Sequence, residues 1–375
     1  MLRLLRADNF KCLDGFELRL DGHALLMGLN GSGKSTVVEL LARLREFWVA
    51  GDKATDCFPG STRTRWGSQR PQAFELQLET AGRPLRLRVE FGAADQGQSV
   101  RIVEEDIQGH DISVRRRGEA FIESGRGPIV QQQFLVPDEL SALPLIFGQL
   151  VQQLPGVAFA MDDAASFVPF RIDPTTMATM AQAPNAALRF DGHNFSSWLL
   201  ARQRYSPSTY QAIARRAADV LKGFVGFEFL PEGHQFRLIT HWRSTAHASG
   251  GLNGATRSYD LDELSDGQRL ILVLSALVEI AGQRELALIL DEPDNYVALQ
   301  EIQPLLLSLM DIPTVQLIVV SHHPEVIDLM AKDYGYVLAR EDDQGPVRVK
   351  RWQAPPGTML PASELVARGD IDGGA

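Results

Sequence analysis

The sequence predicts an α/β fold built around buried parallel strands. A short apolar strand, Ala24 to Met27, leads into a glycine-rich turn, and a helix from Ser35 to Trp48 with one apolar face follows the turn. Residues 286–290 and 315–320 form two continuous apolar runs. Such runs are typical of strands that are covered on both faces of a parallel sheet. Together these observations place the chain in the α/β class.

The other elements are predicted from alternation and from turn residues. Alternation of apolar and polar residues predicts strands at 2–10 and 15–20, and a hairpin whose strands, 74–78 and 85–89, flank a turn. The remaining predictions are an exposed loop at 50–71, weaker strands at 99–107 and 112–117, a mainly helical region at 140–230 with helices at 194–204 and 208–224, a flexible stretch at 249–258, a hairpin at 336–352 and a tail at 354–375.

Composition and charge limit the class of protein. Hydrophobic residues make up 45% of the 375 residues and charged residues 22%, close to the averages for globular proteins. The formal net charge of −10 argues against a surface that binds polyanions everywhere, but it leaves room for a local basic patch. Two cysteines, Cys12 and Cys57, give no disulfide framework. No signal peptide or membrane-spanning helix is predicted, so we expect a cytoplasmic protein without a membrane partner.

A phosphate-binding loop is the strongest motif. Residues 28–35, Gly-Leu-Asn-Gly-Ser-Gly-Lys-Ser, match the pattern G-x-x-x-x-G-K-[ST] at every position. In this pattern backbone N–H groups surround phosphates, Lys34 reaches the β- and γ-phosphates, and the Ser35 hydroxyl binds Mg²⁺. The motif predicts ATP and Mg²⁺ as cofactors. The predicted nucleotide-binding residues of this segment are Asn30, Gly31, Ser32, Gly33, Lys34, Ser35 and Thr36.

Two carboxylates follow the apolar run at 286–290. Asp291 and Glu292 stand where a buried strand ends, and ligands bind at the carboxyl ends of strands in open α/β sheets. Asp291 is placed to hold Mg²⁺, and Glu292 to act as the base for the water that attacks the γ-phosphate. The alternative is that Asp291 and Glu292 only cap the loop after the strand. The presence of a phosphate loop in the same chain favours the functional interpretation.

A third motif, Leu264-Ser265-Asp266-Gly267-Gln268, precedes a nearly all-apolar helix that extends to Ala281. With this motif the chain resembles an ABC-type ATPase, whose signature sequence opens a helix just upstream of the carboxylate strand. The resemblance implies that Ser265 and Gly267 bind the γ-phosphate held by a partner subunit, with Gln268 beside them. Ser265 as an ordinary helix N-cap is a compatible interpretation, because capping and anion binding use the same N–H groups.

The resemblance extends to three smaller features. The switch histidine of ABC-type ATPases directly follows a strand, which fits His322 better than His323. Asp294 and Asn295 occupy the place of the dimer-interface loop, although the family's later aspartate is absent from it. The candidates for the glutamine of the Q-loop are Gln131, Gln132 and Gln133. Polar residues without a function in this place are the alternative.

The long interval between the phosphate loop and the signature segment indicates which group of ABC-type ATPases the chain resembles. Ser35 and Ser265 lie 230 residues apart, far more than in transporter subunits. The opening tract Leu4 to Lys11 and the tracts 170–174 and 191–195 resemble the RecF and OLD-like AAA ATPases related to SMC proteins. That resemblance implies an inserted helical lobe. Only 52 residues follow His323, too few for the nuclease domain of OLD-family enzymes, so we expect any nuclease to be a separate protein.

The predicted organisation is a P-loop ABC-type ATPase head that is split in the sequence. It has a mixed central sheet, an antiparallel β subdomain and an inserted helical lobe. The expected segments are 1–60 and 251–353 for the two parts of the head, 61–135 for the β subdomain with basic loops, 136–250 for the helical lobe and 354–375 for a tail.

The resemblance implies an ATPase that dimerises around ATP. It would act as the switch or sensor subunit of a phage-defence or DNA-repair system and control a separate nuclease or effector, with Glu292, His322 and Lys34 as catalytic residues. A transporter subunit or an ATP-bound scaffold with little turnover are the alternatives. DNA is a further candidate partner, because arginines cluster locally, although solvated surfaces explain them equally well. The clusters are Arg63, Arg65 and Arg70; Arg115, Arg116 and Arg117; and Arg202, Arg204, Arg215 and Arg216.

Overall fold

The protein has a mixed α/β fold, which confirms the predicted class. A computed structural model describes residues 1–67, 69–93, 100–117, 119–124, 132–243, 256–340, 342, 345–355 and 357–368. The chain divides into two compact units. Unit 1 comprises residues 1–169, 285–289 and 316–375, and unit 2 comprises residues 170–284 and 290–315.

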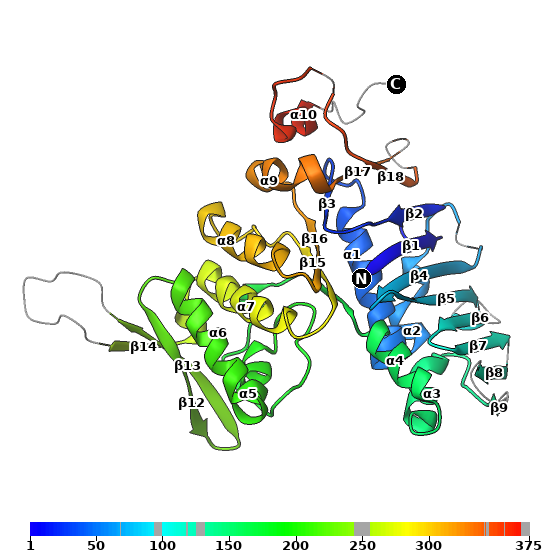
Figure 1. Ribbon diagram of the computed structural model, residues 1–375, viewed down its shortest axis with the longest axis horizontal. Coiled ribbons are helices and arrows are strands. Elements are labelled where there is room, and N and C mark those ends of the chain that lie inside the picture. The colour runs from blue at the N-terminus through cyan, green and yellow to red at the C-terminus, as the bar shows by residue number, and fades with distance from the viewer. Residues whose placement is uncertain are drawn as a thin grey trace, which may run out of the picture. The chain divides into compact units, whose positions relative to one another are not determined.

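An antiparallel sheet of eight strands forms one half of unit 1 (Figure 1). Its strands, in spatial order, are β2 (Phe16–Arg19), β1 (Leu2–Asp8), β4 (Gln72–Thr80), β5 (Arg83–Ala93), β6 (Val100–Gly109), β7 (Ile112–Arg117), β8 (Glu119–Ser124) and β9 (Gln132–Phe134). Tight two-residue turns with left-handed backbone join β4 to β5 at Ala81-Gly82 and β6 to β7 at His110-Asp111.

Apolar residues on one face of this sheet form an aromatic core. Phe58 stacks on Phe74 and Phe91 with ring centroids 5.0 and 4.7 Å apart, and Phe47 meets Phe91 edge-on at 5.2 Å. Four helical segments supply or cover this core: a π-helical turn (Glu46–Ala50), α2 (Ala54–Cys57), α3 (Ala142–Leu150) and α4 (Pro155–Ala164).

A second, mixed sheet carries the phosphate loop. Its spatial order is β10 (Phe167–Phe170), β15 (Leu286–Asp291), β16 (Val315–Val320), β3 (Ala24–Met27), β17 (Gly335–Arg340) and β18 (Val347–Arg351). β3 is parallel to both β16 and β17, as expected for the buried apolar runs. The buried amide of Gln316 links the two sheets, because it accepts from Leu2 N at 2.6 Å and donates to Leu2 O at 3.0 Å. The helices next to this sheet are α1 (Lys34–Arg45), α9 (Pro324–Tyr334) and α10 (Ala362–Arg368).

Unit 2 combines helices with a small antiparallel sheet (Figure 1). The sheet contains β11 (Met180–Ala181), β13 (Gln235–Arg243) and β12 (Phe224–Glu232), with β14 (Thr256–Asp260) also paired to β13. The helices are α5 (Phe195–Tyr205), α6 (Pro207–Val220), α7 (Asp266–Ala281) and α8 (Leu299–Met310), with short 3₁₀ turns at Pro174–Thr176 and Leu261–Glu263. Helix α6 packs on both β12 and α7.

The structure differs from the predicted organisation in three respects. First, β1 and β2 belong to the same sheet as β4 and β5, so no division falls near residue 60. Second, the region 136–250 is not wholly helical: α6 ends at Val220, Gly223 has φ 90°, and the alternating residues of β12 then begin a hairpin. Third, the tail contains α10, which is tied to α9 because Asp328 accepts hydrogen bonds from the backbone N and hydroxyl of Ser363, both at 2.8 Å.

Candidate nucleotide-binding and catalytic site

The phosphate loop connects β3 to α1 and requires its glycines. Gly28, Gly31 and Gly33 have φ of 146°, 79° and 94°, a region that side chains other than glycine rarely adopt. Two of them also lack room for a side chain. A Cβ on Gly28 would lie 2.3 Å from Leu338 O, and one on Gly33 would lie 2.8 Å from Val347 Cγ2. The loop is therefore held close to the backbone of β17 at Leu338 and to the side chain of Val347 in β18.

The phosphate loop leads into the N-terminus of α1, which has no side-chain cap. Gly33 is the N-cap of α1 and has no side chain with which to cap it, and no acid stands in the first turn. Lys34 is buried, and its Nζ donates to Gly28 O at 2.8 Å and Leu29 O at 3.1 Å. Ser32 Oγ is buried and has no hydrogen-bond partner among the described residues. An orphaned hydroxyl beside an uncapped helix end fits an anion such as a phosphate group.

A cationic pocket of about 560 Å³ adjoins this helix end. Thr36 lines it, and so does Arg340, whose Nε donates to Gly31 O at 2.8 Å. Trp66 also lines it and is 48% exposed. The other lining residues are Lys11, Cys12, Ser61, Arg63 and Arg65. The pocket combines several positive charges with one aromatic ring, a set suited to a nucleotide.

Asn9 organises the loop that supplies this pocket. It is fully buried, and its side chain accepts from Thr64 N at 3.0 Å and donates to Arg70 O at 2.7 Å. Asp14 fixes the other side, since it accepts from Trp66 Nε1 at 3.0 Å and from Arg70 at 2.7 Å. Burial alone would raise the pKa of Asp14, but the hydrogen bonds from Trp66 and Arg70 outweigh it and lower the pKa.

The predicted metal-binding carboxylate is tightly paired within unit 2. Asp291 ends β15, its side chain is fully buried, and its Oδ2 accepts two hydrogen bonds from Arg171, one of them from Nε at 2.7 Å. A buried carboxylate needs such a partner, because an unpaired charge is costly away from water. Arg171 belongs to the tract 170–174, so the structure brings that tract to the end of the carboxylate strand.

Glu292 has an unusual backbone for a non-glycine residue. Its φ is 49°, in the left-handed region where side chains are disfavoured. The carboxylate accepts from Asn295 Nδ2 at 2.8 Å. Strain of this kind is concentrated at functional sites. The turn therefore presents Glu292 together with Asn295, one of the predicted interface residues.

The signature segment begins α7 through reciprocal capping. Ser265 Oγ accepts from Gln268 N at 3.3 Å, and Gln268 Oε1 accepts from Ser265 N at 3.0 Å. Gly267 has no room for a side chain, because a Cβ there would lie 2.8 Å from Tyr296 O. Within unit 2 the signature segment therefore packs directly against the loop that follows Glu292.

The two histidines after β16 have different surroundings. His323 is the N-cap of α9, and its Nδ1 accepts from Glu325 N at 3.3 Å. His322 is exposed. His323 thus has a local structural role, and His322 stays the predicted switch residue. Of the Q-loop candidates, Gln131 lies outside the described residues, while Gln132 and Gln133 lie in β9.

Several arginines of the predicted basic clusters have structural partners. Arg116 is buried and donates to the carbonyl oxygens of Leu140, Val136 and Pro137, so its assignment to a surface cluster is wrong. Alternation along β7 turns Arg116 inward while its neighbours face outward. In unit 2, Arg202 lies over the Trp198 ring, Arg204 over Phe236, and Arg216 pairs with Glu279 at 2.6 Å.

One other group has the composition of a metal site. Ligand atoms of Glu46, Asp52 and Cys57 lie within 4.8 Å of one another. Burial raises the pKa of the Cys57 thiol to about 12, and the other two members, Glu46 and Asp52, are exposed acids of a kind that is common without a metal. This group is therefore not assigned a metal.

Comparison with known proteins adds no family. No protein-family model matches the chain, nor does any curated protein sequence match it significantly. Among the described residues, no helix has the length and apolar character that crossing a bilayer requires. The functional assignment therefore depends on the motifs and on the geometry within each unit.

The Arg171–Asp291 pair predicts a specific loss of stability. Replacing Arg171 with alanine leaves the buried carboxylate without this partner, so the free energy of unfolding should fall by about 1–2 kcal/mol, less than for a fully buried pair because Arg171 is half-exposed. Urea unfolding measures it. The control is Arg189→Ala, whose guanidinium is 3.9 Å from Asp191, with a change expected within about 0.5 kcal/mol. Equal losses in the two variants would contradict the importance of the pair.

Proposed function

We propose that this protein is an ATP-hydrolysing enzyme with a P-loop NTPase fold of the ABC type. It dimerises around ATP and acts as the switch or sensor subunit of a system whose nuclease or effector is a separate protein. The observation that carries the proposal is the phosphate loop, in which glycine-dependent backbone, an uncapped helix end and buried Lys34 converge. The cationic pocket beside Thr36 supports a nucleotide over a simple anion.

The residues fit a magnesium–nucleotide complex by their chemistry. Lys34 would supply a positive charge for the β- and γ-phosphates, and Ser35 and Asp291 would supply the oxygen ligands that Mg²⁺ prefers. Mg²⁺, when bound, would neutralise phosphate charge. Arg171 already donates to one oxygen of Asp291. If Mg²⁺ bound to that oxygen, Arg171 would have to share it with the metal or release it.

The other predicted site residues would each have a role in the hydrolysis of ATP. Glu292 would accept a proton from the attacking water as its oxygen bonds to the γ-phosphorus, and ADP leaves as the bond from the γ-phosphorus to the β–γ bridging oxygen breaks. His322 would contact the γ-phosphate as the switch residue. Ser265 and Gly267 would complete the site of a partner subunit, at the positive end of α7.

Steady-state phosphate release from Mg²⁺–ATP tests the enzymatic proposal. We expect turnover that depends on Mg²⁺ and is lost on addition of EDTA. An ATP-bound scaffold would bind ATP but release no phosphate above the uncatalysed rate. That result would contradict the enzyme while leaving nucleotide binding intact.

We expect Trp66 to contribute to the affinity for ATP but not to the rate of hydrolysis. Its half-exposed ring can stack on a base, and such contacts contribute about 1–3 kcal/mol. Trp66→Ala should therefore raise the Kd for ATP about 5- to 150-fold and leave kcat largely unchanged. Tyr205→Ala removes an exposed ring that lines neither this pocket nor its surroundings and is the control for ATP affinity. Equal Kd values for wild type and Trp66→Ala would exclude this ring from the nucleotide site.

A further inference from the structure

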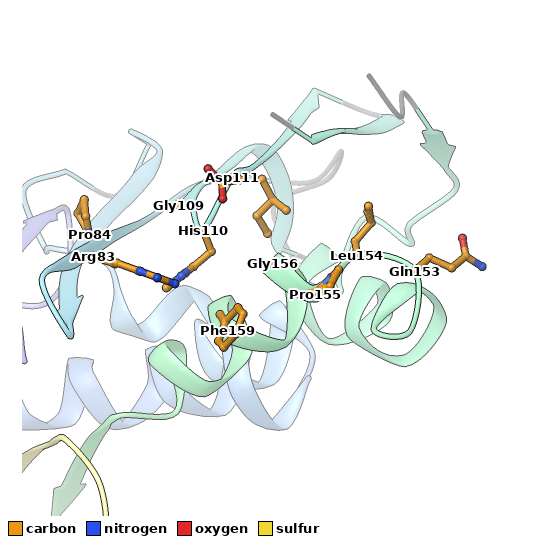
Figure 2. A pocket seen from close by; sticks show the side chains of 11 residues that line it. Arg83, Pro84, Gly109, His110, Asp111, Gln153, Leu154, Pro155, Gly156 and Phe159 are labelled. Carbon is orange, nitrogen blue, oxygen red and sulfur yellow. The ribbon is translucent and has the colours of Figure 1, made fainter. Parts of the chain in front are cut away.

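A second cavity in unit 1 shares no lining residue with the pocket beside the phosphate loop. It has a volume of about 600 Å³, within the range of roughly 300–1,000 Å³ found for small-molecule sites. Its walls are the β6–β7 turn, the start of β5, and the chain that enters α4 (Figure 2). The lining residues are Arg83, Pro84, Gly109, His110, Asp111, Ile112, Gln153, Leu154, Pro155, Gly156 and Phe159.

The walls are fixed by close backbone packing. A Cβ on Gly156 would lie 2.3 Å from His110 O, and one on Gly109 would lie 2.6 Å from Pro84 O. His110 and Asp111 have φ of 52° and 63°, the left-handed conformation that a two-residue hairpin turn requires. Because glycines and a tight turn hold these segments together, the cavity is preformed.

His110 is buried in this wall with one nitrogen unsatisfied. Its side chain is 4% exposed, and Nε2 lies 2.6 Å from Asp163 Oδ2, whose side chain is 6% exposed. The Nε2–Asp163 hydrogen bond uses one of the two ring nitrogens and leaves Nδ1 as the second polar atom of the ring. Nδ1 is buried and has no partner among the described residues. A buried polar atom without a hydrogen bond is uncommon and points to a missing partner.

Two further side chains of the cavity, Arg83 and Phe159, indicate what kind of ligand would supply the missing hydrogen bond. Arg83 is exposed, and no side-chain hydrogen bond or ion pair of its guanidinium is found within the described part of the chain. The Phe159 ring is 49% exposed and lies 5.8 Å from the His110 ring. In Figure 2 the side chains of Arg83 and His110 extend toward one another above Phe159. The N-terminus of α4 carries no side-chain cap and no acid in its first turn, which adds a weaker attraction for an anion.

We propose that this cavity binds a nucleoside monophosphate, with its phosphate at Arg83, its base against Phe159, and a polar edge group of the base at His110 Nδ1. A guanidinium, a stacking ring and an imidazole nitrogen together match this chemistry better than inorganic phosphate or an apolar ligand. The ligand is either a free nucleotide or the phosphorylated end of an oligonucleotide. The proposal does not depend on hydrolysis of ATP.

Calorimetric titration separates this site from the phosphate loop. AMP, GMP, CMP and UMP are titrated into Lys34→Ala protein and, independently, into wild-type protein saturated with ADP. We expect binding of at least one nucleotide in both backgrounds. Arg83→Ala should weaken that binding at least 10-fold and Phe159→Ala about 5-fold. Both positions are on the surface, so folding should be retained. Arg101→Ala, an exposed arginine on β6 that does not line the cavity, should leave the binding unchanged.

A 5′-phosphorylated oligonucleotide distinguishes the two sources. Tighter binding of the oligonucleotide than of its terminal mononucleotide, lost in Arg83→Ala, would indicate a nucleic-acid end. Tighter binding of the mononucleotide would indicate a free nucleotide. Absence of binding by any of the five probes, or binding that Arg83→Ala and Phe159→Ala both leave unchanged, would overturn the proposal.

Discussion

Replacement of Lys34 with alanine is expected to reduce ATP turnover at least 100-fold. Lys34 Nζ is held by Gly28 O and Leu29 O at the centre of the phosphate loop, where it is placed to meet transferring phosphates. Removing one preorganised charge of this kind typically costs about 10²- to 10³-fold in rate. Phosphate release at saturating Mg²⁺–ATP measures the loss.

Lys53→Ala is the matched control for this loss. Lys53 is an exposed lysine that pairs with Glu139 at 2.8 Å and does not line the nucleotide pocket, so its removal should leave turnover unchanged. Because Lys34 also braces the loop, circular dichroism should first establish that Lys34→Ala is folded. A folded Lys34→Ala protein with wild-type turnover would contradict the assignment of the phosphate loop.

Glu292→Gln should separate nucleotide binding from hydrolysis. The amide keeps the shape of the side chain and an acceptor for Asn295, but it cannot take a proton from water. We expect turnover to fall about 10²- to 10⁴-fold, the contribution of a positioned general base, with little change in ATP affinity. Slow hydrolysis should also preserve the ATP-bound dimer, which size-exclusion chromatography with light scattering detects.

An exposed glutamate on α8 provides the comparison. Glu301→Gln makes the same chemical change outside the strained turn at Glu292, in the first turn of α8, and should retain wild-type turnover and oligomeric state. If Glu292→Gln protein binds ATP but is monomeric at all concentrations, the proposed ATP-dependent dimer is wrong. Full turnover by Glu292→Gln would instead remove Glu292 from the catalytic residues.

Sequence periodicity predicted the elements whose signals are local. The runs that became β15 and β16 and the turn between β3 and α1 combine strong apolar patterns with glycine, so their type is evident without tertiary information. The hairpin of β12 and β13 was missed, because its alternation begins immediately after a helical pattern. In β7, a two-residue period explains why three consecutive arginines do not form one surface cluster: Arg116 is buried.

The parts of the candidate site that could not be predicted depend on long-range contacts. Asn9 reaches Thr64, 55 residues away, and thereby brings Trp66 and Lys11 to one pocket. Arg171 reaches Asp291 across 120 residues. Neither pairing leaves a periodic signal in the sequence. Of the pocket residues, the sequence marked Thr36 through the phosphate-loop motif and Arg63 and Arg65 through their clustering in a loop.

Calorimetric titration of the wild-type protein with Mg²⁺–ATP tests the central claim, that the phosphate loop binds a nucleotide, most directly. We predict saturable binding of one ATP per chain, with a Kd within the range of about 1 μM to 1 mM in which substrate constants usually lie. The same titration into Lys34→Ala protein should show at least a 10-fold weaker binding. Absence of saturable binding to folded wild-type protein up to about 1 mM ATP would contradict the account.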